Sequence, residues 1–529
     1  MKRFSILLLS VILFSCAPKN KKLPINIIPQ PNKIEVSTGV KKIKDNISIG
    51  FNNPELENIA HMFIEDIKEK FAITIADFKD ANIKLELINS NNPEESYFLN
   101  SSKKEIQLTA SSKKGMYYGL QTLRQLLLFA ERENGTLKLP ILTISDSPRF
   151  AWRGIMLDES RYFFGKEKVK QLLDFMALHK LNVFHWHLTD VPGWRIEIKQ
   201  YPKLATIGGL GNDIDPNAPA QFYTQDEIRE IVKYASERFI EVIPEIDMPG
   251  HAKAANRAYP EFSGGGSKSH PEFTFNPGYE GTYAYLTNIL KEVVDLFPSK
   301  YIHLGGDEVH FGNESWNTNQ HVLKLMKQQE LTTLRDVESY FIHRMADSIK
   351  MLGRTVIGWD EIVDFGMDKD NSLVMWWRHD KTNTLKNALE NGYKTILCPR
   401  IPLYFDFDQD KSHKNGRKWK DAFSPLEMVY NFPPDTLPGF LNHTNLVAGI
   451  QANIWTERIQ SEERLDYMTY PRLSALAEAG WTKNNIKNID EFYARLKPML
   501  EYLQEQGIEF YNPFDPQSTP EPRGDFRRK

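Results

Sequence analysis

Cysteine, charge imbalance and nucleotide-binding loops are all scarce or missing in this chain. Cys16 and Cys398 are its two cysteines among 529 residues, which excludes a small disulfide-stapled fold. Lys plus Arg number 66 and Asp plus Glu 69, so the net charge is -3 and no basic face predicts a nucleic-acid partner. A hydrophobic content of 41% with 12% aromatics indicates sizeable cores, and the length predicts two or three domains.

No apolar run is long enough to span a bilayer. The longest near the start, Phe4 to Phe14, follows Lys2 and Arg3 and has the length of a secretory signal core. It ends at Leu-Phe-Ser-Cys, which resembles a bacterial lipoprotein cleavage box with a bulky Phe14. We therefore expect residues 1–15 to be a signal peptide, Cys16 to be lipidated, and 16–23 to be a tether. The alternative is an ordinary signal peptide with a chance cysteine.

This reading places the protein in the cell envelope, held to a membrane by its lipid anchor and facing the periplasm or the cell surface. Cys398 would then have no partner, so the mature chain would lack an internal disulfide.

Residues 24–148 mix strand-like and helical patterns. Strands are expected at Ile83 to Ile88 and Glu105 to Thr109, and Gly115 to Ala130 has apolar residues at helical spacing. No His cluster or Gly-rich phosphate loop occurs there. We interpret this stretch as a smaller α+β domain that supports the rest.

From residue 149 to 511 strands and helices alternate. Helices are expected at Lys166 to His179, from a capping box at Thr224 through Arg238, and from a cap at Asp490 to Gly507 with a kink at Pro498. The eight expected strands are 154–157, 182–188, 240–246, 301–304, 355–358, 373–377, 394–397 and 446–450.

Eight such repeats predict an α/β fold, a (β/α)₈ TIM barrel. A doubly wound open sheet is the alternative, but no dinucleotide fingerprint follows the first strand. The Pro-rich tail, 512–529, is expected to be mobile.

Carboxylates and tryptophans follow the expected strands. The most informative segment is Tyr301 to His310, in which a strand-like run ends in two glycines and the adjacent acids Asp307 and Glu308. The C-terminal strand ends of a barrel form its active site. The residues at these ends are Asp158, Arg161, Asp190, Trp194, Asp247, His251, Asp307, Glu308, Trp359, Asp360, Glu361, Trp376, Trp377, Tyr404, Asp406, Trp455 and Glu457. Aromatic faces beside carboxylates predict a carbohydrate pocket.

The adjacency of Asp307 and Glu308 constrains the chemistry. Ordinary glycosidases place two carboxyls on opposite sides of the scissile bond, at least roughly 5 Å apart. Two consecutive residues cannot easily do this, so one acid can protonate the leaving group while the other steers a nucleophile. A 2-acetamido group on the sugar can supply that nucleophile, although Asp158 could also approach from elsewhere.

Six motifs together resemble the β-N-acetylhexosaminidases of glycoside hydrolase family 20. They are, in order along the chain, WRGIMLDESRYF, NVFHWHLTDVPGWRIEI, VIPEIDMPGH, HLGGDE, GWDE and WTE. The resemblance itself runs from about Ile28 to the last helix, nearly the whole mature chain. The resemblance implies exo-hydrolysis of terminal β-linked N-acetylglucosamine or N-acetylgalactosamine with retention, assisted by the substrate, on oligosaccharides or glycoconjugates. It implies no cofactor and no metal.

The resemblance also implies roles for individual residues. Glu308 would be the general acid and base, Asp307 would hold the acetamido N–H, and Tyr404 would orient its carbonyl. Asp190 and His251 would form a relay behind Glu308. Trp359, Trp377 and Trp455 would wall the pocket, and Arg161, Asp406 and Glu457 would bind hydroxyls. Val191 and Tyr162 depart from the usual pattern without being expected to touch these residues.

Three alternatives remain at this point. His185 and His187 share one face of a strand, so with His251 and His303 they could belong to the metal site of a barrel amidohydrolase. A lipoprotein that captures glycans without cleaving them would lack the acid, whereas Glu308 is present. A structural envelope protein would leave the residues at the strand ends unexplained.

Overall fold

The computed structural model describes residues 23–44 and 47–522, so Cys16 and the expected signal peptide lie outside the described residues. The N-terminal part forms one mixed sheet in the order β1-β8-β5-β6-β4-β2-β3, with β7 paired to β8. Its strands are β1 (Lys33–Ile43), β2 (Ile47–Phe51), β3 (Ile73–Ile75), β4 (Ile83–Leu87), β5 (Tyr97–Ser101), β6 (Ile106–Ala110), β7 (Glu131–Glu133) and β8 (Thr136–Asp146).

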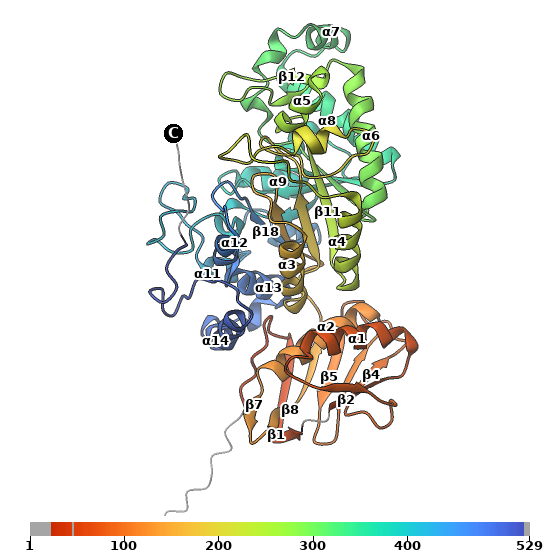
Figure 1. Cartoon of the computed structure of the whole chain (residues 1–529), viewed down its shortest axis with the longest axis vertical. Coiled ribbons are helices and arrows are strands. Elements are labelled where there is room, and N and C mark those ends of the chain that lie inside the picture. The colour runs from red at the N-terminus through yellow and green to blue at the C-terminus, as the bar shows by residue number, and fades with distance from the viewer. Residues whose placement is uncertain (1–22, 45–46, 523–529) are drawn as a thin grey trace, which may run out of the picture.

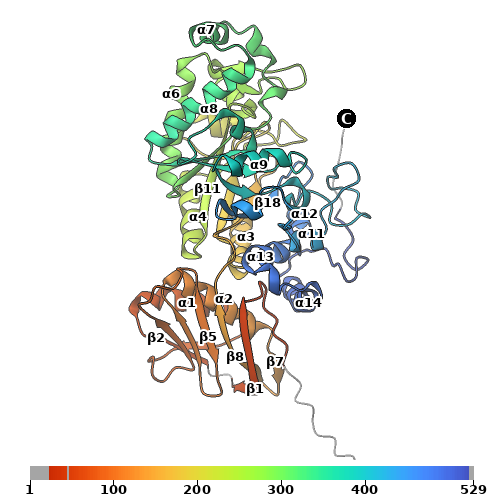
Figure 2. The same ribbon diagram turned by 180° about the vertical axis from the view of Figure 1, so that it is seen from behind.

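Two helices, α1 (Glu57–Ile67) and α2 (Lys113–Leu128), cover the face of this sheet that is turned toward the rest of the molecule (Figure 1). Ser112 caps α2 by accepting from the Gly115 amide, and α2 is buried along almost its whole length. Both faces of α2 are covered because the sheet packs on one side and the second domain on the other. Figure 2 shows the same arrangement from behind.

The second domain is the closed parallel barrel that the strand–helix repeats predicted. Each strand pairs in parallel with its neighbours, and β18 closes the ring on β9 with Gly449 opposite Trp152. Strands such as β10 are buried on both faces, as expected of a parallel sheet covered by helices. The barrel strands are β9 (Trp152–Asp158), β10 (Val183–His187), β11 (Glu241–Met248), β14 (Tyr301–Gly305), β15 (Thr355–Trp359), β16 (Ser372–Trp376), β17 (Lys394–Leu397) and β18 (Val447–Ile454).

Helices surround the barrel, and the short pair β12 (Ser263–Gly265) and β13 (Thr274–Phe275) extends from the end opposite the N-terminal domain (Figure 1). The capping box at Thr224 is confirmed at α4. The last helix is capped by Asn488 rather than Asp490, and it continues through Pro498. The helices are α3 (Lys166–Leu178), α4 (Gln225–Glu237), α5 (Lys253–Ala258), α6 (Glu280–Leu296), α7 (Gln320–Gln328), α8 (Leu334–Met351), α9 (Thr382–Glu390), α10 (Arg400–Leu403), α11 (Leu426–Tyr430), α12 (Glu462–Thr469), α13 (Arg472–Trp481) and α14 (Ile489–Glu505).

A buried polar cluster around Asp146 joins the two domains. Its carboxylate accepts from Tyr97 Oη at 2.6 Å and from Trp481 Nε1 at 2.9 Å, and Lys180 Nζ lies 3.4 Å away. Lys180 and Trp481 come from the barrel domain, whereas Tyr97 and Asp146 come from the sheet. Because the starts of the barrel strands face this interface, the N-terminal domain leaves their C-terminal ends open.

The expectation of a mobile tail is wrong for residues 512–522. Glu521 lies 3.1 Å from Arg464 and accepts from the Lys414 amide at 2.9 Å, and the Thr519 carbonyl accepts from Tyr467 Oη. These side chains belong to the barrel domain, so this segment is packed against it. Among the described residues no helix is long and apolar enough to cross a membrane, and Cys398 is a buried free thiol.

Candidate active site

A cavity of about 250 Å³ lies at the C-terminal ends of the barrel strands. Ten of the eleven residues expected at the site line it: Arg161, His251, Asp307, Glu308, Trp359, Trp377, Tyr404, Asp406, Trp455 and Glu457. The eleventh, Asp190, lies directly behind His251. The ten lining residues come from seven of the eight strand–loop units, and Asp190, which follows β10, comes from the eighth.

Asp307 and Glu308 share the end of β14 but differ in exposure. The backbone takes positive φ angles at Gly305 and Gly306, of 75° and 88°, and Glu308 is itself left-handed at 54°. Such a conformation is uncommon for a residue with a side chain and concentrates at functional sites. The Glu308 side chain is 34% exposed, whereas that of Asp307 is 11% exposed.

His251 connects these acids to Asp190. Its Nδ1 lies 3.0 Å from Asp190 Oδ1, and its Nε2 lies 3.6 Å from Asp307 and 3.8 Å from Glu308. Burial alone would lower the pKa of His251, but Asp190 and then Asp307 outweigh it and raise the pKa to about 9. Burial opposes the charge on Asp190, yet Arg161 and His251 hold the pKa of that carboxyl well below its usual range.

A second carboxylate, Glu245, lies beneath this pair inside the barrel. His187 joins the two layers, with Nε2 at 3.0 Å from Asp190 Oδ2 and Nδ1 at 2.6 Å from Glu245 Oε2. Burial disfavours the charged ring, but Glu245 and Asp190 raise the pKa of His187 to about 10. Glu245 also accepts from Trp359 Nε1 at 2.9 Å, so it orients one wall of the pocket.

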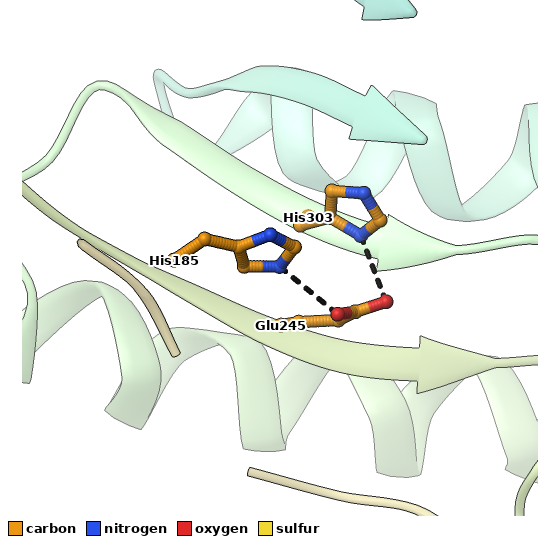
Figure 3. A group of neighbouring side chains, drawn as sticks. All are labelled: His185, Glu245 and His303. Atoms are coloured by element: carbon orange, nitrogen blue, oxygen red, sulfur yellow. Dashed lines mark ion pairs between the residues drawn. The ribbon is translucent and has the colours of Figure 1, made fainter. Parts of the chain in front are cut away.

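The remaining histidines of the alternative metal site also face Glu245. His185 Nε2 and His303 Nδ1 lie 2.9 and 3.0 Å from its oxygens (Figure 3). Gln451 Oε1 accepts from Trp152 Nε1, so its Nε2 donates to His185 Nδ1 at 3.0 Å. The proton of neutral His185 therefore lies on Nε2, which leaves no lone pair for a metal on that side. The donor set fits a hydrogen-bonded network better than an amidohydrolase site.

Four aromatic side chains form the walls. Trp377 donates through Nε1 to Glu361 at 3.0 Å and stacks with Tyr404, at 6.3 Å between ring centroids and 11° between planes. Trp359 and Trp455 meet at 5.9 Å. The carboxylates Glu245 and Glu361 thus fix two of the indoles from behind, so the walls are preorganised.

The opposite end of the cavity contains Arg161, Asp406 and Glu457. Arg161 lies 3.2 Å from Asp158 and 2.7 Å from Asp190, so it also positions the relay. Arg417 bridges the two pocket carboxylates, at 2.9 Å from Asp406 Oδ2 and 2.5 Å from Glu457 Oε1. Burial raises the pKa of Asp406 to about 7 in spite of Arg417.

Several lining residues were not expected from the sequence, namely Arg400, Phe407, Arg417, Lys418, Trp419 and Arg458. Most lie on loops without a periodic pattern, so no sequence signal could have placed them. Two expected tryptophans are elsewhere: Trp194 is buried and donates to the Ile196 carbonyl, and Trp376 packs in the outer core. Val191 does touch a site residue, because its amide donates to Asp190 Oδ1.

Comparison with known proteins gives the same assignment over both domains. The glycosyl hydrolase family 20 catalytic domain matches residues 150–484, and domain 2 of that family matches residues 24–147. A β-hexosaminidase of Porphyromonas gingivalis is 34% identical over 96% of this chain and 67% of its own length. One from Vibrio furnissii is 34% identical over 88% of this chain and 77% of its own.

A solved structure supports the assignment in three dimensions. The exo-β-N-acetylglucosaminidase of Vibrio harveyi, in complex with N-acetylglucosamine, superimposes with a TM-score of 0.85 at 31% identity. The match covers 94% of this chain and 80% of that one. With its barrel, its preceding domain and its paired acids, the chain belongs to glycosyl hydrolase family 20.

Proposed function

We propose that this protein is an exo-acting β-N-acetylhexosaminidase that removes terminal β-linked N-acetylglucosamine or N-acetylgalactosamine with retained configuration. The observation that carries the proposal is the pair Asp307–Glu308 at one strand end, beside an aromatic pocket. The other carboxylates in the cavity, Asp406 and Glu457, are both engaged by Arg417. Neither is placed as a free nucleophile opposite Glu308.

Asp158, the other acid considered as a nucleophile, does not face the cavity. It is fully buried, and its oxygens accept from the amides of Ser160, Arg161 and Thr456. Its contacts make it a structural support for Arg161. An acid elsewhere in the cavity is therefore unsuited to attack, which leaves the acetamido oxygen of the substrate as the nucleophile.

The reaction proceeds in two steps. In the first, Glu308 gives its proton to the leaving oxygen as the C1–O bond breaks, and the acetamido carbonyl oxygen bonds to C1 to give an oxazolinium ion. Asp307 accepts a hydrogen bond from the acetamido N–H, and Tyr404 orients the carbonyl. In the second step Glu308 takes a proton from water, whose oxygen attacks C1 and reopens the ring. Two inversions at C1 give net retention.

The surrounding groups support this chemistry. Trp359, Trp377 and Trp455 present apolar faces to the acetamido methyl and the sugar ring. We infer that Arg161, Asp406 and Glu457, which line the same cavity, bind the ring hydroxyls. The N-acetylglucosamine bound in the Vibrio harveyi relative favours the same sugar here.

Two aryl glycosides test the proposal: the 4-nitrophenyl β-glycoside of N-acetylglucosamine and that of glucose. The 2-acetamido sugar should be cleaved at least about a thousandfold faster, because only it carries the nucleophile. Equal rates would exclude participation by the acetamido group. Binding without turnover would favour a glycan-capturing protein, and loss of activity on dialysis against chelator with recovery on zinc would favour the metal enzyme.

We also propose that the protein is exported and anchored in the cell envelope through lipid on Cys16. The basic start, the short apolar core and the cysteine after it support this. Metabolic labelling with a radioactive fatty acid should mark the wild type and not Cys16→Ser. Equal labelling of both proteins, or none of either, would refute the anchor without affecting the proposed reaction.

A further inference from the structure

Asp247 is an ionisable residue of the site to which the mechanism above gives no role. It is the penultimate residue of β11 and is 3% exposed. It lies close to the acids of the cavity without lining it. Neither of its carboxyl oxygens has a hydrogen-bond partner among the described residues. Buried carboxyl groups are normally hydrogen-bonded, so two orphaned oxygens on one side chain need an explanation.

The first glycine of the HLGGDE motif makes room for this carboxyl. A Cβ at Gly305 would lie 1.8 Å from Asp247 Oδ1, far inside contact distance, and the backbone there has a φ of 75°. Any other residue at position 305 would displace Asp247. The turn that presents Asp307 is thus built around the Asp247 side chain.

Charged groups surround Asp247 from several elements. The acids are Glu245 on the same strand, Asp190 after β10 and Asp307 after β14, and the cations are Arg161, His187 and His251. One carboxylate oxygen each of Asp247 and Asp307 and one ring nitrogen of His251 lie within 4.8 Å of one another. The other cations are already engaged, since Arg161 and His187 contact Asp190.

The neutral form of Asp247 is favoured in this environment. A buried carboxylate without a hydrogen-bond donor is strongly unfavourable, so such a group retains its proton. Burial, then Asp307, Glu245 and Asp190, raise the pKa of Asp247 well above its usual range. The protonated group has an O–H to donate, and Asp307 Oδ1 is itself buried without a partner among the described residues.

We propose that Asp247 keeps a proton that it directs toward Asp307, and that it is thereby the positioning residue which holds Asp307 as a carboxylate for the acetamido N–H. The inference rests on the proposed function. Asp307 needs this help because burial and the neighbouring acids Glu308, Glu361 and Glu245 outweigh His251 and raise its pKa to about 8. The proton stays on Asp247 throughout the cycle, so no additional reactant is required.

Infrared spectroscopy of the free enzyme, with ¹³C-labelled aspartate, tests the protonation directly. The wild type at neutral pH should show the C=O band of a protonated buried carboxyl, and Asp247→Asn should lose it. If the band is absent from the wild type, or persists unchanged in Asp247→Asn, the inference is wrong. This measurement does not depend on turnover, so it separates failure of the inference from failure of the proposed function.

Kinetics with an activated 2,4-dinitrophenyl 2-acetamido glycoside test the effect on Asp307. Asp247→Ala should move the acid limb of kcat upward by about one to two pH units, the size of a lost hydrogen bond to a charged group. Asp247→Asn retains an N–H donor, so its acid limb should stay near that of the wild type, with no more than about a tenfold loss in kcat.

Thermal unfolding and product affinity would show that both variants are folded. The inference would be overturned if Asp247→Asn and Asp247→Ala lost the same fraction of kcat. It would also be overturned if the acid limb of kcat in Asp247→Ala stayed at the wild-type pH. Wild-type activity that a chelator abolishes and a divalent cation restores would also overturn it, since Asp247, His251 and Asp307 would then hold a metal.

Discussion

His251 Nδ1 lies 3.0 Å from Asp190 Oδ1, while the opposite ring nitrogen faces both acids of the cavity. This contact joins the surface of the pocket to a buried chain of polar contacts, which continues from Asp190 through His187 to Glu245. Acidic and imidazole groups alternate along it, so each charge has a neighbour of opposite sign. The acids of the cavity therefore function within an electrostatic unit that reaches into the barrel.

Glu308→Gln should lose the most activity on substrates with a poor leaving group. We expect kcat/KM for an N-acetylglucosamine disaccharide to fall by about 10²–10⁴, since the amide cannot protonate the leaving oxygen. With a 2,4-dinitrophenyl aglycone the first step needs little acid assistance, so the loss should be much smaller and azide should restore turnover. Equal losses on both substrates would contradict the assignment of Glu308 as the acid.

Asp307→Asn should behave differently, because it removes a charge that stabilises the oxazolinium ion whatever the leaving group. We expect kcat to fall about 10²–10³-fold on activated and unactivated substrates alike. Rates for several aryl glycosides of graded leaving-group acidity measure this. An unimpaired variant on the most activated substrate would refute the steering role of Asp307.

His251 makes stability depend on pH. Its pKa rises from an ordinary 6.5 to about 9 in the folded protein, so its stabilisation is fully present below pH 6.5 and is lost as pH rises through about 9. The difference in unfolding free energy between the wild type and His251→Gln should reach about 3 kcal/mol at pH 6 and shrink above pH 9. Urea unfolding at several pH values measures it; a constant difference would contradict the charge assignment.

Arg417 is predicted to hold the hydroxyl-binding end of the pocket. Arg417→Gln would leave the carboxyls of Asp406 and Glu457 without the cation that bridges them, so they should repel or take up a proton. We expect KM for the N-acetylglucosaminide to rise about tenfold with a smaller change in kcat, a loss of roughly 1.4 kcal/mol in binding. Lys420→Gln, on an exposed position of the same loop, is the control and should match the wild type.

Replacing Asp146 should lower the stability of the protein without reducing its catalytic activity. Asp146→Ala leaves Lys180 buried without its carboxylate, which should lower the free energy of unfolding by about 3–5 kcal/mol. Activity at low temperature should be retained, because the cluster lies at the end of the barrel opposite the pocket. Glu35→Gln, which removes an exposed ion pair with Lys33, is the control and should not change the unfolding transition.

The barrel and the residues at its strand ends could be predicted because each strand carries its own signal. Asp307, Trp359 and Trp455 come shortly after strand-like runs, and closure of a parallel barrel brings such positions together. Trp376 and Trp377 show the limit of this reasoning. Adjacent residues on a strand point to opposite faces, and the sequence did not say which one faces inward.

Other features depend on three-dimensional contacts that no local pattern encodes. The motif containing His185 and His187 suggested a metal, but the side chains of Gln451 and Glu245 determine where their protons lie. Arg417 reaches the pocket from an irregular loop, and the C-terminal segment is ordered through Glu521 by a distant arginine. These contacts join residues far apart in the chain, so they became visible only in the folded structure.

The N-terminal domain and the cavity lie at opposite ends of the barrel. Leu23, the first described residue, lies beside α2 and β8. The cavity lies at the C-terminal ends of the barrel strands, away from the sheet domain, which packs at the other end of the barrel. A protein tethered to a surface by its leading residues would consequently turn its pocket outward, with the sheet domain as a spacer beneath it. Long glycan chains could then be trimmed from their tips without approaching the surface that holds the enzyme.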